Sequence, residues 1–147
     1  MSEKRICVIG AGNWGKNHIK TLRKLGALAG IVETDQTHCR EIQMEYPDIE
    51  IFNDVSSALE YNFDGFTVAT PAETHFRIGN QLLTAGYPVL IEKPLALNSK
   101  DAETLVMTAE MNGVTLMVGH LLLFHPAIQK IKELLNAGRI GNLQYIY

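Results

Sequence analysis

The sequence contains few cysteines, no long apolar run and no targeting segment. Cys7 and Cys39 are its only cysteines, and Cys7 lies inside an apolar segment, which argues against the disulfide framework of a small secreted protein. Thiols of this kind suit a reducing compartment, so we expect a cytoplasmic protein. The apolar segments are far shorter than the roughly 20 residues that span a bilayer, and the N-terminal residues show no signal-peptide pattern. A membrane location is therefore not expected.

An excess of one charge is also missing. Lys and Arg total 13 against 16 Asp and Glu, for a net charge of −3, and no basic run offers a nucleic-acid or membrane-surface face. Metal-ligand spacing is missing too. His120 and His125 are not spaced to share one helix face, and no cysteine or acid joins them. We therefore expect no nucleic-acid partner and no metal site.

Strand-like and helix-like segments alternate along the chain. The expected strands cover residues 5–12 (ending in a glycine turn), 27–33, 50–54, 64–70, 88–92, 115–120 and 143–147. The expected helices cover residues 14–26, 36–47 (stopped before Pro47), 55–60, 71–86, 99–113 and 126–141. Because the strands are apolar throughout, rather than at every second residue, they fit a doubly wound α/β domain, in which helices cover both faces of a parallel sheet.

The helix that follows residue 70 carries a local start signal. Thr70-Pro71-Ala72-Glu73 has the pattern of a capping box, with Pro71 at the first helical position. We therefore expect Thr70 to cap this helix and Gly86 to end it.

The segment Gly10-Ala11-Gly12-Asn13-Trp14-Gly15 follows the first strand and opens the first helix. Its glycines match G-x-G-x-x-G: Gly10 permits the tight turn, Gly12 lets a pyrophosphate approach the backbone, and Gly15 lets the helix pack closely on the strand. The helix starts at Asn13 or Trp14, and its free N–H groups would face the phosphates. Trp14 either covers this turn or packs on its own helix. In this context the pattern favours a dinucleotide site over a purely structural turn.

An acid follows the second strand. Glu33 stands 18 positions after Gly15, where a carboxylate accepts hydrogen bonds from the adenosine ribose hydroxyls. Asp35 is the competing candidate, and the alternation of a strand end directs only one of the two inward; we expect it to be Glu33. A carboxylate there repels a 2′-phosphate, so NAD is favoured over NADP. Arg40 is expected to lie on the next helix.

Polar residues follow the strands at their carboxyl ends, which in a parallel sheet meet at one edge, where ligands bind. These strand ends are Glu33, Asn53-Asp54, Thr70-Pro71, Glu92-Lys93 and Gly119-His120. We therefore expect Lys93 to share a crevice with the glycine turn. There a partly desolvated amine would serve as the general base or acid for a substrate hydroxyl, and the alternative is a surface lysine in an ordinary strand exit.

Four motifs in order, taken together, resemble the Gfo/Idh/MocA oxidoreductase family over the whole chain. They are GAGNWG (10–15), ATPAETH (69–75), EKP (92–94) and VGHLLLFHP (118–126), of which E-K-P is the most specific. The resemblance implies that Lys93 is the catalytic or substrate-positioning lysine and that the Lys93–Pro94 peptide bond is cis. It also implies that Thr70, Pro71 and His75 line the cofactor cleft, and it makes His120 and His125 candidates for substrate contact or for structural roles.

The resemblance further implies a dinucleotide-binding domain over residues 1–121 and the start of a substrate and dimerisation domain over residues 122–147. Family members are longer, so we expect an N-terminal portion with its second domain largely absent, which binds NAD but is inactive alone. As a full-length protein we expect a homo-oligomer that transfers hydride between the nicotinamide and a hydroxyl of a sugar, polyol or nucleotide-sugar. The alternative is a non-catalytic module that senses NAD or NADH.

Overall fold

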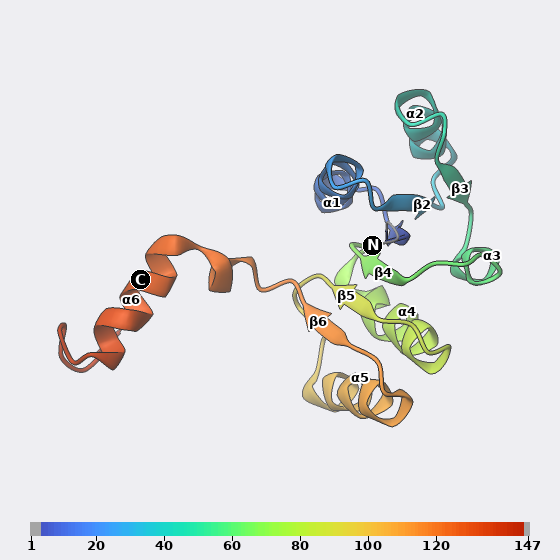
Figure 1. Cartoon of the computed structure of the whole chain (residues 1–147). Coiled ribbons are helices and arrows are strands. Elements are labelled where there is room, and N and C mark those ends of the chain that lie inside the picture. The colour runs from blue at the N-terminus through green and yellow to red at the C-terminus, as the bar shows by residue number, and fades with distance from the viewer. Residues whose placement is uncertain (1–3, 146–147) are drawn as a thin grey trace.

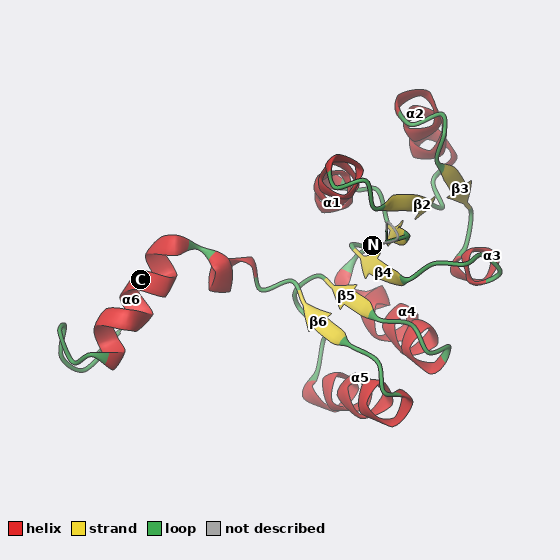
Figure 2. Ribbon diagram, in the orientation of Figure 1, coloured by secondary structure: helices red, strands yellow, loops and turns green. Residues whose placement is uncertain are grey.

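The computed structural model describes residues 4–145. Its strands are β1 (Ile6–Ile9), β2 (Leu28–Val32), β3 (Glu50–Phe52), β4 (Gly65–Val68), β5 (Val89–Ile91) and β6 (Leu116–Val118). They form a six-stranded sheet in the order β3-β2-β1-β4-β5-β6, and every neighbouring pair is parallel (Figures 1 and 2). The predicted doubly wound sheet is therefore confirmed.

Helices connect the strands in the predicted alternation. They are α1 (Asn13–Lys24), α2 (Gln36–Glu45), α3 (Val55–Leu59), α4 (Ala72–Thr84), α5 (Ser99–Asn112) and α6 (Pro126–Asn136), with a 3₁₀ turn, η1 (Leu121–Phe124), before the last. Side-chain carboxylates cap two of them. Asp35 accepts from the N–H groups of Thr37 and His38 in α2, and Asp54 accepts from the Ser57 N–H in α3. The side-chain amide oxygen of Asn98 caps α5 by accepting from the Asp101 N–H.

Two apolar layers lie on opposite faces of the sheet, because successive residues of a strand point to opposite sides. Val8 belongs to a buried cluster with Ile19 of α1, so α1 and α2 cover that face. The next residue, Ile9, belongs to a second cluster with Leu82 of α4 and Leu105 of α5. Both clusters are built from fully or nearly fully buried side chains. The apolar character of the strands on both sides follows from this double coverage.

The direction in which successive strands are added to the sheet reverses at β1. This strand pairs with β2 on one side and with β4 on the other, so the chain first builds outward through β3 and then returns to add β4, β5 and β6. The loops that leave β1 and β4 consequently diverge at their carboxyl ends and leave a crevice between them. The position of the candidate site follows from this topology.

Three local predictions are wrong. Pro71, not Thr70, is the N-cap of α4, and no side chain caps it, because the Thr70 hydroxyl instead accepts from the Thr74 hydroxyl at 2.7 Å. The last helix ends at Asn136 rather than at residue 141, because Gly138 takes a left-handed conformation with φ of 65°. Residues 143–145 form no strand, since no neighbouring strand pairs with them, and residues 146–147 lie outside the described part.

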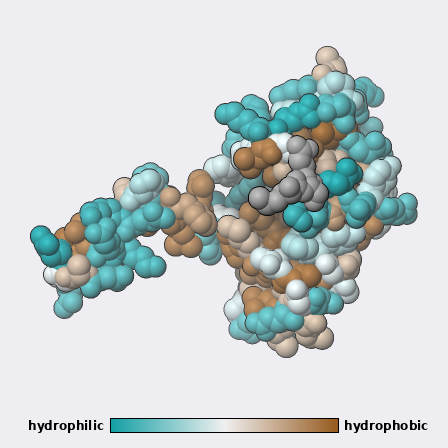
Figure 3. Space-filling model, in the orientation of Figure 1, coloured by the Kyte–Doolittle hydropathy of each residue, from teal (hydrophilic) through white to brown (hydrophobic). Residues whose placement is uncertain are grey.

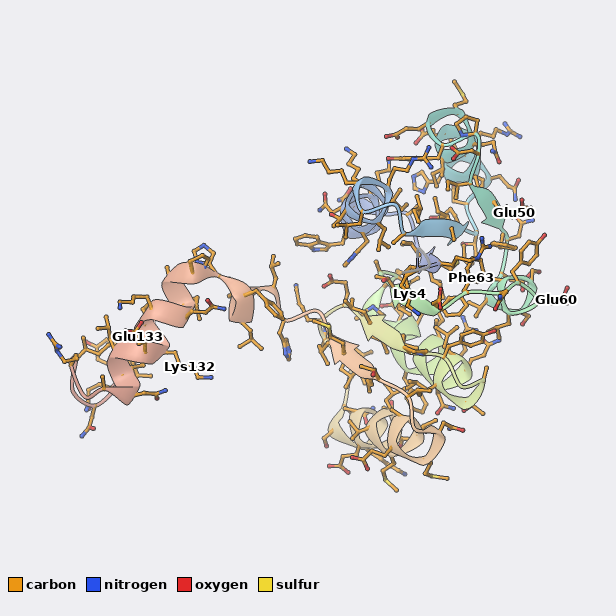
Figure 4. The ribbon with its side chains drawn as sticks, in the orientation of Figure 1. Lys4, Glu50, Glu60, Phe63, Lys132 and Glu133 are labelled. Atoms are coloured by element: carbon orange, nitrogen blue, oxygen red, sulfur yellow. The ribbon has the colours of Figure 1, made fainter. Side chains whose placement is uncertain are left out.

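After β6 the chain leaves the sheet. Figure 1 shows η1 and α6 extending away from it, and Figure 4 places Lys132 and Glu133 of α6 far from the strands. The side chains of η1, from Leu121 to Phe124, are each at least 60% exposed and contribute to the hydrophobic patch near that segment in Figure 3. Within the described residues, no helix has the length and apolar character needed to cross a membrane. The predicted boundary between residues 121 and 122 stays a prediction.

We expect the free energy of unfolding to fall as the pH drops below about 4, the range in which aspartates ordinarily titrate. Hydrogen bonds or ion pairs in the folded state hold the carboxyl pKa below its usual value at Asp35, Asp48, Asp54 and Asp64. A pKa that is lower in the folded state adds stability above the unfolded value, and this stability is lost as the pH falls through the folded value. Urea unfolding followed by circular dichroism between about pH 7 and pH 2 measures it.

The control is Asp64→Asn, which removes the carboxylate that accepts from the Arg5 N–H and the Lys4 amine. It should be less stable than the wild type near neutral pH and equally stable in acid, where both side chains are uncharged. A wild-type stability that stays constant across this range would contradict the assignment.

Candidate active site

The glycine turn after β1 is fixed by close backbone contacts. Gly10 has φ of 90°, and a Cβ atom there would lie 2.9 Å from the carbonyl oxygen of Ala69 and from the Thr70 side chain. A Cβ at Gly15 would overlap the carbonyl oxygen of Gly10. Only glycine fits these positions. The predicted close packing of α1 on the end of β1 is confirmed, and the turn also touches the end of β4.

The N-terminus of α1 opens onto solvent at this turn. Gly12 is its N-cap, and a Cβ there would meet no atom within 4 Å. The first intrahelical bond runs from Lys16 N–H to the Gly12 carbonyl, which leaves the N–H groups of Asn13, Trp14 and Gly15 without a helical acceptor. Together with the helix dipole, these donors form an anion-binding position of the kind that holds a pyrophosphate.

Glu33 is directed at the glycine turn, whereas Asp35 is not. One carboxylate oxygen of Glu33 accepts from the Ala11 N–H at 2.9 Å, and the other accepts from the N–H groups of Thr34 and Asp35 at 2.8 and 2.9 Å. Its side chain is nearly buried. The Asp35 carboxylate instead caps α2, where the N–H groups of His38 and Thr37 lower its pKa. The predicted inward direction of Glu33 is confirmed; a ribose contact stays a prediction.

The turn after β4 is held by His75, which is 1% exposed. Its Nε2 lies 2.8 Å from the Thr70 carbonyl oxygen, and its Nδ1 lies 2.7 Å from the Pro94 carbonyl oxygen. The Thr74 hydroxyl, one residue earlier on α4, lies 2.7 Å from both the Thr70 hydroxyl and the Pro71 carbonyl. His75 therefore ties the turn after β4 to the segment after β5.

The segment after β5 presents Lys93 at the same edge. The Lys93–Pro94 peptide bond is cis, as the resemblance implies. The Glu92 carboxylate accepts from the Lys93 N–H at 3.2 Å and pairs with His18 of α1 at 2.8 Å. Lys93 itself is exposed, and its amine makes no hydrogen bond within residues 4–145. The expectation of a partly desolvated amine is therefore wrong for this chain, because solvent reaches the side chain from the open side of the edge.

A cleft of about 800 Å³ joins these segments. The predicted residues that line it are Gly10, Gly12, Asn13, Trp14, Glu33, Thr70, Pro71, His75, Glu92 and Lys93. Gly15 lies beneath the turn rather than in the wall. The expectation that the glycine turn and Lys93 share a crevice is confirmed.

His120 and His125 do not join this cleft. Both are exposed, and the Nδ1 of His125 accepts from the Ala127 N–H at 3.2 Å at the start of α6. A substrate contact by either residue stays a prediction. The described part of the chain holds no group of three or more His, Cys, Asp or Glu side chains arranged to bind a metal ion.

Sequence reasoning missed one wall of the cleft and one contact. Thr74, Arg77 and Gln81 of α4 line the far end, and their helical spacing on the face that follows Thr70 was a usable signal. The pairing of His18 with Glu92 joins residues 74 positions apart, for which no local pattern exists.

Comparison with known proteins agrees with the geometry of the cleft. Residues 4–120 match the Gfo/Idh/MocA profile, which is described as an oxidoreductase family with an NAD-binding Rossmann fold. UDP-N-acetylglucosamine 3-dehydrogenase of Acidithiobacillus ferrooxidans is 30% identical over 138 residues, which are 90% of this chain and 42% of that protein. Inositol 2-dehydrogenase 1 of Saccharopolyspora erythraea is 32% identical over 146 residues, which are 94% of this chain and 43% of that protein.

Solved structures show the same likeness. The WlbA dehydrogenase from Bordetella pertussis, in complex with NADH and UDP-GlcNAcA, superposes with a TM-score of 0.88 at 26% identity, over 95% of this chain and 43% of that one. The chain thus spans less than half the length of these relatives.

We expect Glu33→Ala to loosen the glycine turn. The substitution leaves the Ala11 N–H without its buried acceptor, so amide hydrogen exchange at Ala11 should accelerate while the core strands stay protected. Exchange followed by two-dimensional NMR measures this directly.

The matched control is Asp35→Ala. It frees the N–H groups of Thr37 and His38 and should leave Ala11 protected. Equal acceleration at Ala11 in both variants would show that Glu33 does not anchor the turn.

Proposed function

Because the chain belongs to the Gfo/Idh/MocA oxidoreductase family, whose domain of this kind is an NAD-binding Rossmann fold, we propose that it forms the cofactor-binding part of an NAD-dependent dehydrogenase. The predicted family and its cofactor are thereby confirmed. The reaction we propose is hydride transfer between the nicotinamide and a hydroxyl-bearing carbon of a sugar, polyol or nucleotide-sugar. One observation carries the proposal: Lys93 and the helix N-terminus that suits a pyrophosphate line the same cleft.

Different residues of the cleft would bind the cofactor and transfer the proton. The free N–H groups of Asn13, Trp14 and Gly15 would hold the pyrophosphate, and Glu33 would accept from the adenosine ribose. When bound, NAD supplies the acceptor for the hydride. Oxidation of an alcohol also releases the hydroxyl proton. Lys93 lines the cleft and its side chain has no hydrogen-bond partner among the described residues, so its uncharged amine would take this proton and the ammonium would return it in the reverse direction.

Support for the substrate class comes from the relatives. Their names specify UDP-N-acetylglucosamine and inositol, both of which carry secondary ring hydroxyls. The proposal for this chain is correspondingly broad and covers sugars, polyols and nucleotide-sugars.

We expect NAD to bind the chain as it stands. Trp14 is the only tryptophan of the sequence and lines the cleft at 49% exposure, so its fluorescence should change on titration with NAD. NADP should bind at least about tenfold more weakly, because a 2′-phosphate would face the Glu33 carboxylate. A chain that binds neither cofactor at millimolar concentration, with an unchanged melting temperature, would contradict the proposal.

We expect Lys93→Ala in the full-length protein to lower kcat by about 100- to 10,000-fold, the usual contribution of a general acid or base, while the affinity for NAD stays the same. Stopped-flow absorbance of NADH and calorimetric titration of NAD measure the two quantities. A full-length wild type that binds NAD and oxidises no polyol, sugar or nucleotide-sugar would favour the sensing module over the dehydrogenase.

A further inference from the structure

We propose that His18 and His75 are positioning residues that hold the Lys93 segment from the two opposite faces of the sheet. The segment consists of Glu92, Lys93 and Pro94. His18 contacts the Glu92 carboxylate, and His75 contacts the Pro94 carbonyl oxygen. The inference deepens the function proposed above, on which it rests for the task of Lys93. Neither histidine is needed to touch the reacting atoms, because each acts through a neighbour of the lysine.

His18 acts on the residue before the lysine. Its Nε2 lies 2.8 Å from one carboxylate oxygen of Glu92, and the side chains are only 23% and 15% exposed. The second carboxylate oxygen accepts from the backbone N–H of Lys93 at 3.2 Å. The carboxylate thus links α1 directly to the backbone of the lysine. In this partly buried setting the bond is less screened by water than a surface pair.

Gly119 supplies the space that this carboxylate needs. It follows β6, and its N–H donates to the Ile91 carbonyl at 2.8 Å. A Cβ atom on Gly119 would lie 2.9–3.0 Å from three atoms of the Glu92 carboxylate. The backbone of Gly119 does not have positive φ. An alanine at this position would therefore displace the Glu92 carboxylate, the flexible end of that side chain, and would not strain the backbone of residue 119.

His75 acts on the residue after the lysine. Its two ring nitrogens lie 2.7 and 2.8 Å from the carbonyl oxygens of Pro94 and Thr70, and the ring is buried. Carbonyl oxygens only accept, and either neutral tautomer of the ring carries one N–H, so the ring donates to one of the two carbonyls and packs against the other. An apolar side chain at position 75 would offer no hydrogen-bond donor to the carbonyl oxygens of Pro94 and Thr70. The ring thus fixes the distance between the turn after β4 and the segment after β5.

The topology explains why two different helices supply the histidines. α1 covers one face of the sheet and α4 covers the other. Each of these helices begins at a turn of the cofactor cleft, α1 at Gly12 and α4 at Pro71. His18 lies in the second turn of α1 and His75 in the first turn of α4. A cofactor that contacts the N-termini of both helices would therefore be linked through His18 and His75 to the residues on both sides of Lys93.

Three substitutions test the proposal in the chain as it stands: His18→Leu, His75→Leu and Gly119→Ala. The first readout needs no cofactor. Exchange of the Lys93 amide hydrogen should accelerate in all three. His18→Leu and Gly119→Ala displace the Glu92 carboxylate that accepts from this N–H, and His75→Leu removes the contact with the Pro94 carbonyl. The second readout is the NMR signal of the Lys93 ε-methylene group, assigned with Lys93→Arg. Its displacement on addition of NAD should be lost in the variants. For His18→Leu and Gly119→Ala, whose residues do not line the cleft, calorimetry should still detect NAD binding within about fivefold of the wild type.

Matched controls separate positioning from general destabilisation. Leu82→Ala removes a fully buried side chain from the same helix as His75, and Arg23→Gln removes an ion pair from the same helix as His18. Both lower stability away from the segment and should leave the two Lys93 readouts unchanged. His18→Gln retains a donor for the Glu92 carboxylate and should restore the wild-type readouts.

Each outcome decides between the two proposals. Wild-type Lys93 exchange in His18→Leu, His75→Leu and Gly119→Ala would overturn the positioning assignment, whether or not NAD binds. So would an equal acceleration in Leu82→Ala. A wild-type chain that binds no NAD, with Lys93 exchange that still responds to the three variants, would overturn the proposed function and leave the positioning assignment intact.

Discussion

The parallel pairing of β1 with β4, and of β4 with β5, is the constraint on which the site depends. The hydrogen bonds of this pairing continue past the strand ends, from Ala69 N–H to the Ile9 carbonyl and from Glu92 N–H to the Val68 carbonyl. The three loops that form the cleft therefore start from one rigid edge. Gly10, which accepts no side chain against Ala69, then sets how closely the first two loops approach. Residues 83 positions apart in the sequence, Gly10 and Lys93, come to share one cavity for this reason.

Most of the fold was predictable because its signals are repeated or local. Apolar strands alternate with helices along the chain, and the glycine turn carries its spacing within six residues. The direction of Glu33 followed from the two-residue period of a strand end. The errors lie where one side chain has more than one possible partner or where a glycine ends a helix early. Thr70-Pro71-Ala72-Glu73 has the pattern of a capping box, but the Thr70 hydroxyl accepts from the Thr74 hydroxyl, and Pro71 is the N-cap.

The site was predictable in its outline and not in its connections. Residue types at strand ends show which side chains reach the edge, but not which of them bond to one another. The pairing of His18 with Glu92 depends on the rotamers of two residues from different elements, and on the empty volume at Gly119. The exposure of Lys93 depends on what stands opposite the edge, which no motif in the sequence encodes. The final strand failed for a similar reason, since strand pairing requires a partner.

The contacts also show where selectivity can reside in this part of the molecule. In the function that we propose, cofactor recognition uses backbone N–H groups at the start of α1 and the Glu33 carboxylate, which accepts from the Ala11 N–H. The Lys93 segment is held by its neighbours from both faces of the sheet and leaves the amine itself unengaged. In the function that we propose, the uncharged form of this amine takes the proton of the substrate hydroxyl. For the dehydrogenase that we propose, discrimination among substrates would then come from groups that position the substrate hydroxyl, and this edge would set the relation between the cofactor and Lys93.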